Sequence, residues 1–255
     1  MTVVIGTPIY RQGAYAIDKF LSNQKQVQQS YPASELVLAT NEYDFIEELE
    51  SLVSFWKLRG TVLLHEVVKP DYARSRVWNI VFGREAIREY TLSQTKAGYL
   101  LFLDADMTFE PSVIKKMEKE IQGYDVVFSG YPGKHYGAGL AGAGCLMLTR
   151  SILENIKFRC YEFKNGEVIF EDNLLEMDLF RLGSRIKKGF LLSINHYKSA
   201  TEARHITPKP IGILRKITNY SFVRYWLIRA SIITQHNIPW RLNIFLNKLL
   251  DIVDK

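Results

Sequence analysis

Two aspartates one residue apart, Asp104 and Asp106, are the residues of this sequence best placed to do chemistry. They directly follow five apolar residues, Tyr99 to Leu103, which predict a strand buried on both faces. Two carboxylates at the end of a buried strand repel each other, and a divalent cation removes that cost because it prefers hard oxygen ligands. The pair therefore predicts a magnesium or manganese site. The alternative is that both aspartates only form a turn before a helix near Pro111.

Strands and helices alternate along the chain before this pair. Strands are predicted at 2–9, 35–40, 62–67 and 99–103, and helices at about 14–29, 43–57 (ended by Gly60) and 74–91. This alternation predicts an α/β fold with a mostly parallel central sheet flanked by helices. Ligands bind beyond the carboxyl ends of the strands in such sheets. Thr7, Pro8 and Asn41 are at such ends, so we expect them to meet the two aspartates in space.

The segment after the aspartates contains a glycine-rich stretch at 130–144, with six glycines in fifteen residues. Such a stretch predicts a loop in which backbone approaches a ligand or another segment closely. Further elements are predicted on either side of it: helices at 111–121, 150–156 and 170–182, and strands at 124–129 and 145–149.

Composition predicts one large globular domain with a basic tail. The chain has 255 residues, of which 47% are apolar and 24% charged. We expect no secretory signal and no membrane-spanning helix. Two cysteines, Cys145 and Cys160, favour reduced thiols in a cytoplasmic protein. Residues 1–208 hold 25 basic and 25 acidic side chains, whereas 209–255 hold eight Lys or Arg and two Asp, so we divide the chain into a catalytic domain and a tail at this point.

The tail, 209–255, mixes aromatic and aliphatic residues with Lys and Arg. This mixture predicts one or two amphipathic helices that attach peripherally to the inner face of a membrane with anionic lipids. The alternative is that the apolar faces pack on the catalytic domain or on a second subunit of a homodimer. Nucleic acid is not expected as a partner, because the basic residues alternate with bulky apolar ones and form no polar stripe.

The order of these motifs resembles the GT-A-fold glycosyltransferases, and among them the family-2-like enzymes. The resemblance covers residues 2–197 and depends on Thr7-Pro8, the D-x-D motif Asp104-Ala105-Asp106, the glycine-rich loop that ends at Gly144, and Glu171-Asp172. It implies a GT-A fold and the transfer of a sugar from a UDP- or GDP-linked donor to a glycan or lipid-linked acceptor, helped by Mn²⁺ or Mg²⁺. An inverting reaction is implied if Asp172 is the base.

The resemblance also implies roles for individual residues. It assigns metal ligation to Asp106 and Asp104, with His196 as a further ligand. It assigns nucleotide-sugar binding to these residues: Thr7, Pro8, Asn41, Arg76, Asn79, Asp104, Ala105 and Gly144. Asn41 departs from the family pattern, which has acidic residues after the second strand, so the nucleobase stays open. For His196, the alternative is an ordinary hydrogen-bonded histidine.

The resemblance also makes Asp172 the candidate general base, and it implies that Glu171 assists it or holds the acceptor. Because Asp172 is at the start of a helix, we expect its carboxylate to stay ionised. The alternative is that Asp172 is only the N-cap of that helix.

Two other function classes compete with this interpretation. A sugar-1-phosphate nucleotidyltransferase would need a glycine-rich triphosphate loop after the first strand, and residues 6–11, Gly-Thr-Pro-Ile-Tyr-Arg, are a poor match. A non-catalytic nucleotide- or carbohydrate-binding protein would not need both Asp106 and Asp172.

Overall fold

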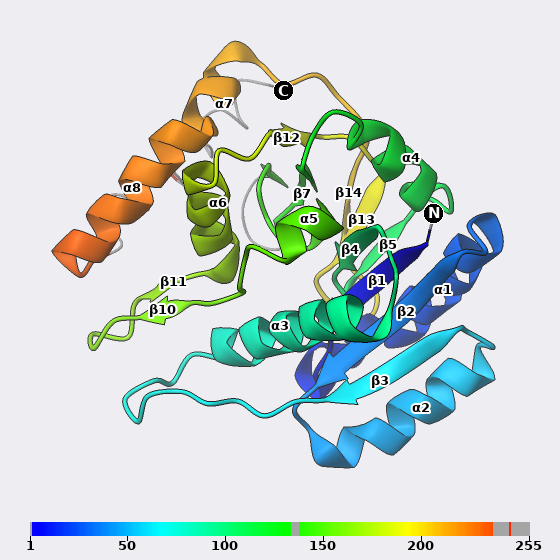
Figure 1. The fold of residues 1–255 in the computed structure, drawn as a ribbon. Coiled ribbons are helices and arrows are strands. Elements are labelled where there is room, and N and C mark those ends of the chain that lie inside the picture. Colours follow the sequence, from blue (N-terminus) through cyan, green and yellow to red (C-terminus); the bar gives the residue numbers. More distant parts are fainter. Residues whose placement is uncertain (1, 134–137, 237–244, 246–255) are drawn as a thin grey trace.

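The structure is a computed structural model that describes residues 2–133, 138–236 and 245. A seven-stranded sheet with helices on both faces forms its centre (Figure 1). In order across the sheet, the strands are β12 (Ile186–Gly189), β6 (Val126–Ser129), β9 (Cys145–Thr149), β4 (Tyr99–Leu103), β1 (Val3–Pro8), β2 (Ser34–Thr40) and β3 (Gly60–Leu64). Only β9 is antiparallel to its neighbours, β4 and β6. The predicted mostly parallel α/β sheet is confirmed.

Two layers of helices cover the sheet. One face packs against α1 (Ile17–Ser30), α2 (Ile46–Phe55) and α4 (Val113–Glu120), and the other packs against α3 (Val77–Gln94), α5 (Arg150–Leu153) and α6 (Glu171–Arg181). Strand β4 serves both layers, because Leu101 and Leu103 pack on the first and Leu100 and Phe102 on the second. Burial of each of these side chains stabilises the folded protein by roughly 1.5–3 kcal/mol.

The chain leaves the sheet at the end of β4. Asp104 follows β4, and β5 (Met107–Phe109) then pairs with β13 (Ile194–Tyr197) in a separate three-stranded sheet that ends with β14 (Ala203–Ile206). The predicted D-x-D motif therefore occupies the junction between the two sheets. This junction is at the carboxyl edge of the large sheet, where ligands bind in α/β folds.

The remaining elements are short. They are η1 (Arg11–Ala16), η2 (Tyr43–Phe45), the strand pair β7 (Tyr131–Pro132) and β8 (Ala138–Gly139), the hairpin β10 (Tyr161–Glu162) and β11 (Val168–Ile169), α7 (Ile213–Thr218) and α8 (Ser221–Thr234). The hairpin was not predicted, because its strands have two residues each. Gly60 was expected to end a helix and instead begins β3, and Lys57 provides the left-handed residue after α2, with φ of 54°.

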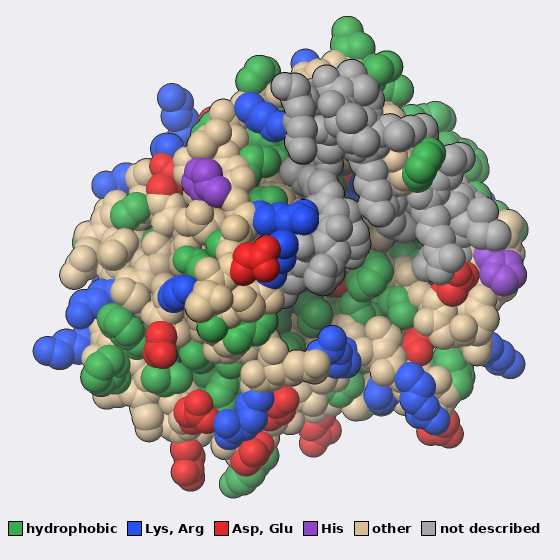
Figure 2. All heavy atoms as spheres, turned by 180° about the vertical axis from the view of Figure 1, so that it is seen from behind, with side chains coloured by type: hydrophobic (Ala, Val, Ile, Leu, Met, Phe, Trp, Pro, Cys, Tyr) green, Lys and Arg blue, Asp and Glu red, His purple; other side chains and the backbone are tan. Residues whose placement is uncertain are grey.

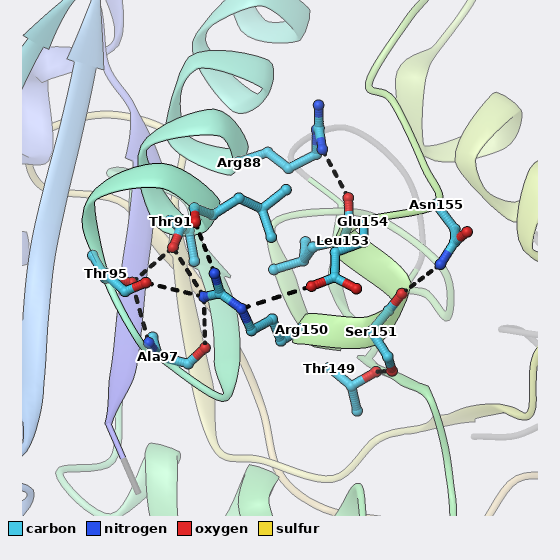
Figure 3. Close-up of polar contacts among 11 residues, drawn as sticks. Arg88, Thr91, Thr95, Ala97, Thr149, Arg150, Ser151, Leu153, Glu154 and Asn155 are labelled. Carbon is cyan, nitrogen blue, oxygen red and sulfur yellow. Dashed lines mark hydrogen bonds and ion pairs between the residues drawn. The ribbon is translucent and has the colours of Figure 1, made fainter.

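The side chain of Arg150, which lies outside helix α3, caps the C-terminal end of that helix (Figure 3). Its Nη1 group donates to the carbonyls of Thr91, Thr95 and Ala97 at 3.1–3.3 Å, and Nη2 donates to the carbonyl of Leu92 at 2.7 Å. These are carbonyls near the end of a helix or just beyond it, some of which have no partner inside the helix. Arg150 therefore fixes the end of α3 against the start of α5, next to β4.

The described part of the tail packs on the α/β domain formed by residues 2–208. Helix α8 lies along α6, and Ile228 is buried in a small cluster with Leu174 and Met177 of α6. This contact agrees with the packing alternative for residues up to 236, and the tail residues 237–244 and 246–255 lie outside the described part. Among the residues that the structure describes, we find no helix with the length and hydropathy that crossing a bilayer requires.

Candidate active site

A cavity of about 820 Å³ opens at the carboxyl edge of the large sheet. Most of the residues predicted from the sequence line it: Pro8, Arg76, Asn79, Asp104, Ala105, Asp106, Gly144, Glu171 and Asp172. Residues from β1, the start of α3, the β4–β5 junction and the start of α6 thus meet in one cavity although they are far apart in the sequence. Three predicted residues, Thr7, Asn41 and His196, are not part of the lining.

The Asp104 carboxylate pairs with a buried arginine on α3. Arg84 Nη2 donates to Asp104 Oδ1 at 2.9 Å, and Arg84 Nε is 3.4 Å from Glu171 Oε1. The Arg84 side chain is only 3% exposed and its guanidinium lies over the ring of Phe102. Such a buried cation needs compensating carboxylates. Arg84 therefore connects the D-x-D motif to the start of α6 and compensates part of the charge for which we expected a cation.

Asp106 faces the imidazole of His196. Nε2 of His196 is 3.5 Å from Asp106 Oδ1, and its Nδ1 is 2.5 Å from the carbonyl oxygen of Pro132. The carbonyl can only accept, so Nδ1 carries a proton and donates it, which leaves Nε2 directed at Asp106. Burial lowers the pKa of His196, but Asp106, the Pro132 carbonyl and Asp104 together outweigh burial and the pKa is raised. On the other side, the Tyr15 hydroxyl is 3.4 Å from Asp106 Oδ2.

Asp106 and His196 would provide part of the ligand set of a divalent cation. A carboxylate and an imidazole face each other at Asp106 and His196, and a backbone carbonyl orients the ring, as is usual for histidine ligands of metals. Within the described residues, no group of three or more His, Cys, Asp or Glu side chains is arranged to hold a metal ion. A cation at this place would therefore complete its coordination with oxygens of a ligand or of water.

Glu171 and Asp172 form the first turn of α6. The residue at the N-cap position is Phe170, with no capping side chain, so the alternative role of Asp172 as N-cap is wrong. One carboxylate oxygen of Asp172, Oδ1, is buried and has no hydrogen-bond partner among the described residues. That oxygen is therefore available to accept a proton from a ligand.

The expectation that Asp172 stays ionised because it is at the start of a helix omitted the effect of its burial. Burial and the neighbouring Glu171 carboxylate raise the pKa of Asp172 to about 7, whereas Arg224, the backbone N–H of Asn173 and Arg84 lower it by less. The lowering of the Asp172 pKa at the helix N-terminus is thus smaller than the increase caused by desolvation and by the like charge of Glu171. Burial also raises the pKa of Glu171, against the lowering effect of Arg84. A carboxyl group that titrates near neutral pH is well matched to general-base catalysis.

The start of α3 forms one wall of the cavity. Arg76, exposed and hydrogen-bonded to Gln12, precedes the helix, and Asn79 is in its first turn. Arg74 does not line the cavity. The Tyr10 hydroxyl donates to the carbonyl of Asn79 at 2.5 Å and so joins this wall to the end of β1.

A carboxylate from the unpredicted hairpin orders the segment before α3. Glu162 accepts hydrogen bonds from the backbone N–H groups of Arg74, at 2.7 Å, and Ser75, at 3.1 Å, and from Trp78 Nε1 at 2.9 Å. Only 3% of Glu162 is exposed, so these bonds are protected from water.

Thr7 and Asn41, which were predicted to contact a nucleotide, do not line the cavity. Thr7 is fully buried and its hydroxyl donates to the carbonyl of Leu103 at 2.7 Å, which ties β1 to the end of β4. Asn41 is half-buried beside the cavity, and its Oδ1 is buried without a hydrogen-bond partner among the described residues. The neighbouring Glu42 lines the cavity in its place.

Gly144 lets backbone pass close to the D-x-D motif. A Cβ atom at this position would lie 2.5 Å from Asp104 Oδ2 and 2.8 Å from Met107 Cε. The Gly144 carbonyl also accepts a hydrogen bond from the backbone N–H of Asp104 at 3.1 Å. The part of the glycine-rich stretch at 134–137 lies outside the described residues.

Sequence reasoning missed Arg84, Tyr10, Tyr15 and Tyr131, which also line the cavity. For Arg84 a signal exists: it occurs on the stripe Val77, Val81, Arg84, Arg88 and Thr91, which is the buried face of α3. A cation on an otherwise inward-facing stripe indicates a buried partner of opposite charge. The tyrosines carry no such signal, because tyrosine is common both in cores and at surfaces.

Comparisons with known proteins give a likeness in structure only. No family model and no curated protein matches the sequence. Among solved structures, the mannosyltransferase PcManGT from Pyrobaculum calidifontis, in complex with GDP-Man and Mn²⁺, matches with a TM-score of 0.52 and 12% identity, over 97% of this chain and 69% of that one. Residues 1–349 of TarS from S. aureus match with a TM-score of 0.51 and 15% identity, over 93% of this chain and 67% of that one. Full-length TarS is matched over only 40% of its length. The chain has the GT-A fold that the sequence resemblance implied.

Proposed function

We propose that this protein is a glycosyltransferase that moves a sugar from a nucleoside-diphosphate sugar to an acceptor hydroxyl, with inversion at the anomeric carbon. The observation that carries the proposal is one cavity lined by both Asp106, beside His196, and Asp172, whose free oxygen faces no protein partner. A site for a diphosphate with a cation and a site for a base are the two parts that such a transfer requires. The shared fold with a mannosyltransferase bound to GDP-Man and Mn²⁺ supports it.

The donor, UDP- or GDP-linked, would bind between β1 and the start of α3. Pro8 and Asn79 would border the nucleoside, Arg76 would bind phosphate oxygens, and Asp104 would bind the ribose or a metal-bound water. Ala105 and Gly144 would allow the sugar to approach the backbone of the β4–β5 junction. Asn41 would reach the nucleobase only after a side-chain movement, and Thr7 would act indirectly by fixing β1 to β4.

Asp106 and His196 would hold Mn²⁺ or Mg²⁺, with Asp104 in support. When bound, the cation neutralises the charge that develops on the departing diphosphate. Pro132 orients the ring of His196, and Arg84 orients the carboxylate of Asp104.

Asp172 would take the proton of the acceptor hydroxyl as its oxygen bonds to the anomeric carbon and the bond from that carbon to the diphosphate oxygen breaks. Inversion would follow, because the base and the leaving group would then lie on opposite sides of the reacting carbon. Glu171 would bind the acceptor or set the pKa of Asp172, because its charge is the largest influence on that pKa after burial. The acceptor would be a glycan or a lipid-linked saccharide at the cytoplasmic side of a membrane.

Nucleotide-sugar turnover with two single variants tests the proposal. The wild-type protein should release nucleoside diphosphate from UDP- or GDP-sugars only with Mn²⁺ or Mg²⁺. Asp106→Ala should lose metal-dependent donor binding in calorimetry, whereas Asp172→Asn should keep donor binding and lose transfer. Formation of a nucleotide sugar from a nucleoside triphosphate would favour a nucleotidyltransferase instead. Binding without turnover under all conditions would favour a non-catalytic binding protein.

A further inference from the structure

Helices α7 and α8 each bury one arginine side chain and expose several hydrophobic side chains. Arg215 of α7 is 1% exposed and Arg224 of α8 is 6% exposed, whereas Ile213 is 74% exposed and Trp226 is 49% exposed. A helix on a water-facing surface shows the reverse, with an apolar stripe toward the core. The outward side of these helices therefore presents apolar surface of the kind that marks interaction sites.

Buried polar contacts fix this orientation. Arg224 pairs with Glu176 of α6 and donates to Asn173 Oδ1 at 3.2 Å. Lys188 of β12 pairs with the same Glu176, so the buried carboxylate is compensated from two elements. The Arg215 guanidinium lies 5.7 Å from the ring centre of Phe190. Rotation of the helices would remove these contacts and leave buried charges unpaired, at high cost. The outward apolar side is thus set by the fold.

The exposed side, which we call the α7–α8 face, combines apolar, aromatic and cationic groups. Its exposed hydrophobic residues are Ile213, Leu214, Ile217, Tyr220, Phe222, Trp226 and Ile233. In the reversed view of Figure 2, hydrophobic side chains form the outline at the upper right, the side on which α7 and α8 lie. Lys209, Lys216 and Arg229 are exposed on the same two helices and the segment before them, and residues 209–236 contain no Asp or Glu.

We propose that the α7–α8 face docks on a membrane surface that contains anionic lipids. Exposed aliphatic side chains beside Tyr and Trp match the interfacial region of a bilayer, and cations on a segment, 209–236, that contains no Asp or Glu match anionic headgroups. Helix α7 has 6 residues and α8 has 14, so both lie in the interface and do not cross it. The face departs from ordinary surfaces, where acidic and basic side chains are interspersed, as along the lower rim in Figure 2.

A second copy of this chain is a less favourable cover for the same face. A twofold interface brings the same patch of both copies together, so Lys209, Lys216 and Arg229 would face a patch that also has only cations. Like charges brought together across an interface are costly. Membrane docking does not depend on the proposed glycosyl transfer, because it is carried by the outward residues of α7 and α8 alone.

Co-sedimentation of the full chain with vesicles tests the docking. We expect binding to phosphatidylcholine vesicles that contain phosphatidylglycerol, and weak binding to phosphatidylcholine alone. Raising the salt from about 0.1 M to about 1 M shortens the Debye length from about 10 Å to about 3 Å and should release most of the protein. The double variant Ile217→Ser, Trp226→Ser should weaken binding by about tenfold or more, because two side chains lose their burial in the interface.

The matched control changes two hydrophobic residues that are even more exposed elsewhere. Tyr43 of η2 is 81% exposed and Phe55 of α2 is 73% exposed, so Tyr43→Ser, Phe55→Ser should leave vesicle binding unchanged. Melting temperatures of all variants confirm that they are folded. The proposal is overturned if the full chain does not co-sediment with anionic vesicles. This result is expected if the chain's own residues after 236 cover the α7–α8 face. The proposal is also overturned if the Ile217, Trp226 variant instead abolishes a dimer that forms without lipid, since the cover is then a second copy.

Discussion

The rate of glycosyl transfer should rise with pH through neutrality, because Asp172 must lose its proton before it can act as a base. Its pKa of about 7 in the folded protein lies well above the ordinary value of 3.8. The ionised fraction is then about one eleventh at pH 6, one half at pH 7 and ten elevenths at pH 8. The expected increase in kcat/KM between pH 6 and pH 8 is therefore about tenfold. A base with an ordinary aspartate pKa would give a flat profile over this range.

Two variants should move the midpoint of this profile in opposite directions. Glu171→Gln removes the negative charge that raises the pKa of Asp172, so the midpoint should fall. Arg224→Gln removes a positive charge that lowers it, so the midpoint should rise. Arg229→Gln is the control, because Arg229 is exposed on the outer side of the same helix and should leave the midpoint unchanged.

Initial rates of nucleoside diphosphate release, measured from about pH 5.5 to about pH 9 at saturating metal, provide the assay. Arg224→Gln unpairs part of a buried cluster, which typically costs about 3–5 kcal/mol, so its melting temperature is measured first. Lys188 still compensates Glu176 in that variant. A wild-type profile that is flat or falls between pH 6 and pH 8, or a Glu171→Gln midpoint that rises, would refute the role assigned to Asp172.

Two further predictions concern the frame around the site. Gly144→Ala should weaken donor binding by roughly 5- to 150-fold in calorimetry, because the new Cβ would meet Asp104 Oδ2 at 2.5 Å and overpacking of this kind costs about 1–3 kcal/mol. An unchanged dissociation constant would contradict this close approach. Gly123→Ala, which strains the backbone at a φ of 80° away from the cavity, should leave donor binding unchanged and controls for general destabilisation. Arg150→Ala should lower the free energy of unfolding by about 2 kcal/mol in urea, because four carbonyls at or just beyond the end of α3 lose a hydrogen bond from its guanidinium. Arg150→Lys should recover only part of this, and full recovery would show that charge alone matters.

The fold was largely predictable from the sequence, whereas the environment of each site residue was not. Tyr99 to Leu103 are apolar and end at two aspartates, so a buried strand and its carboxyl end could be placed from local pattern alone. The pKa of Asp172 near 7 could not be predicted from local pattern. It depends on burial and on charges, such as that of Arg224 on α8, which come close to Asp172 only in the folded chain. The hydroxyl of Thr7 was expected to face a ligand, yet it bonds the Leu103 carbonyl of a neighbouring strand.

Local pattern also underestimated the role of the C-terminal helices. The net charge of residues 209–255 indicated a basic appendage, but net charge does not distinguish buried cations from exposed ones. In the structure Arg215 and Arg224 are buried, whereas the remaining cations of the described tail are exposed: Lys209, Lys216 and Arg229. Helix α6, which carries Asp172, therefore packs against α8, although the sequence pattern assigned α8 to a separate tail.

The most direct test of the account is a crystal structure of the protein with Mn²⁺ and a nucleoside diphosphate, with the metal located by its anomalous scattering. The account predicts one manganese peak bonded to the carboxylate of Asp106 and to diphosphate oxygens, within the cavity at the end of β4, with His196 beside it. A manganese peak outside this cavity, or a diphosphate bound away from Asp106, would contradict it.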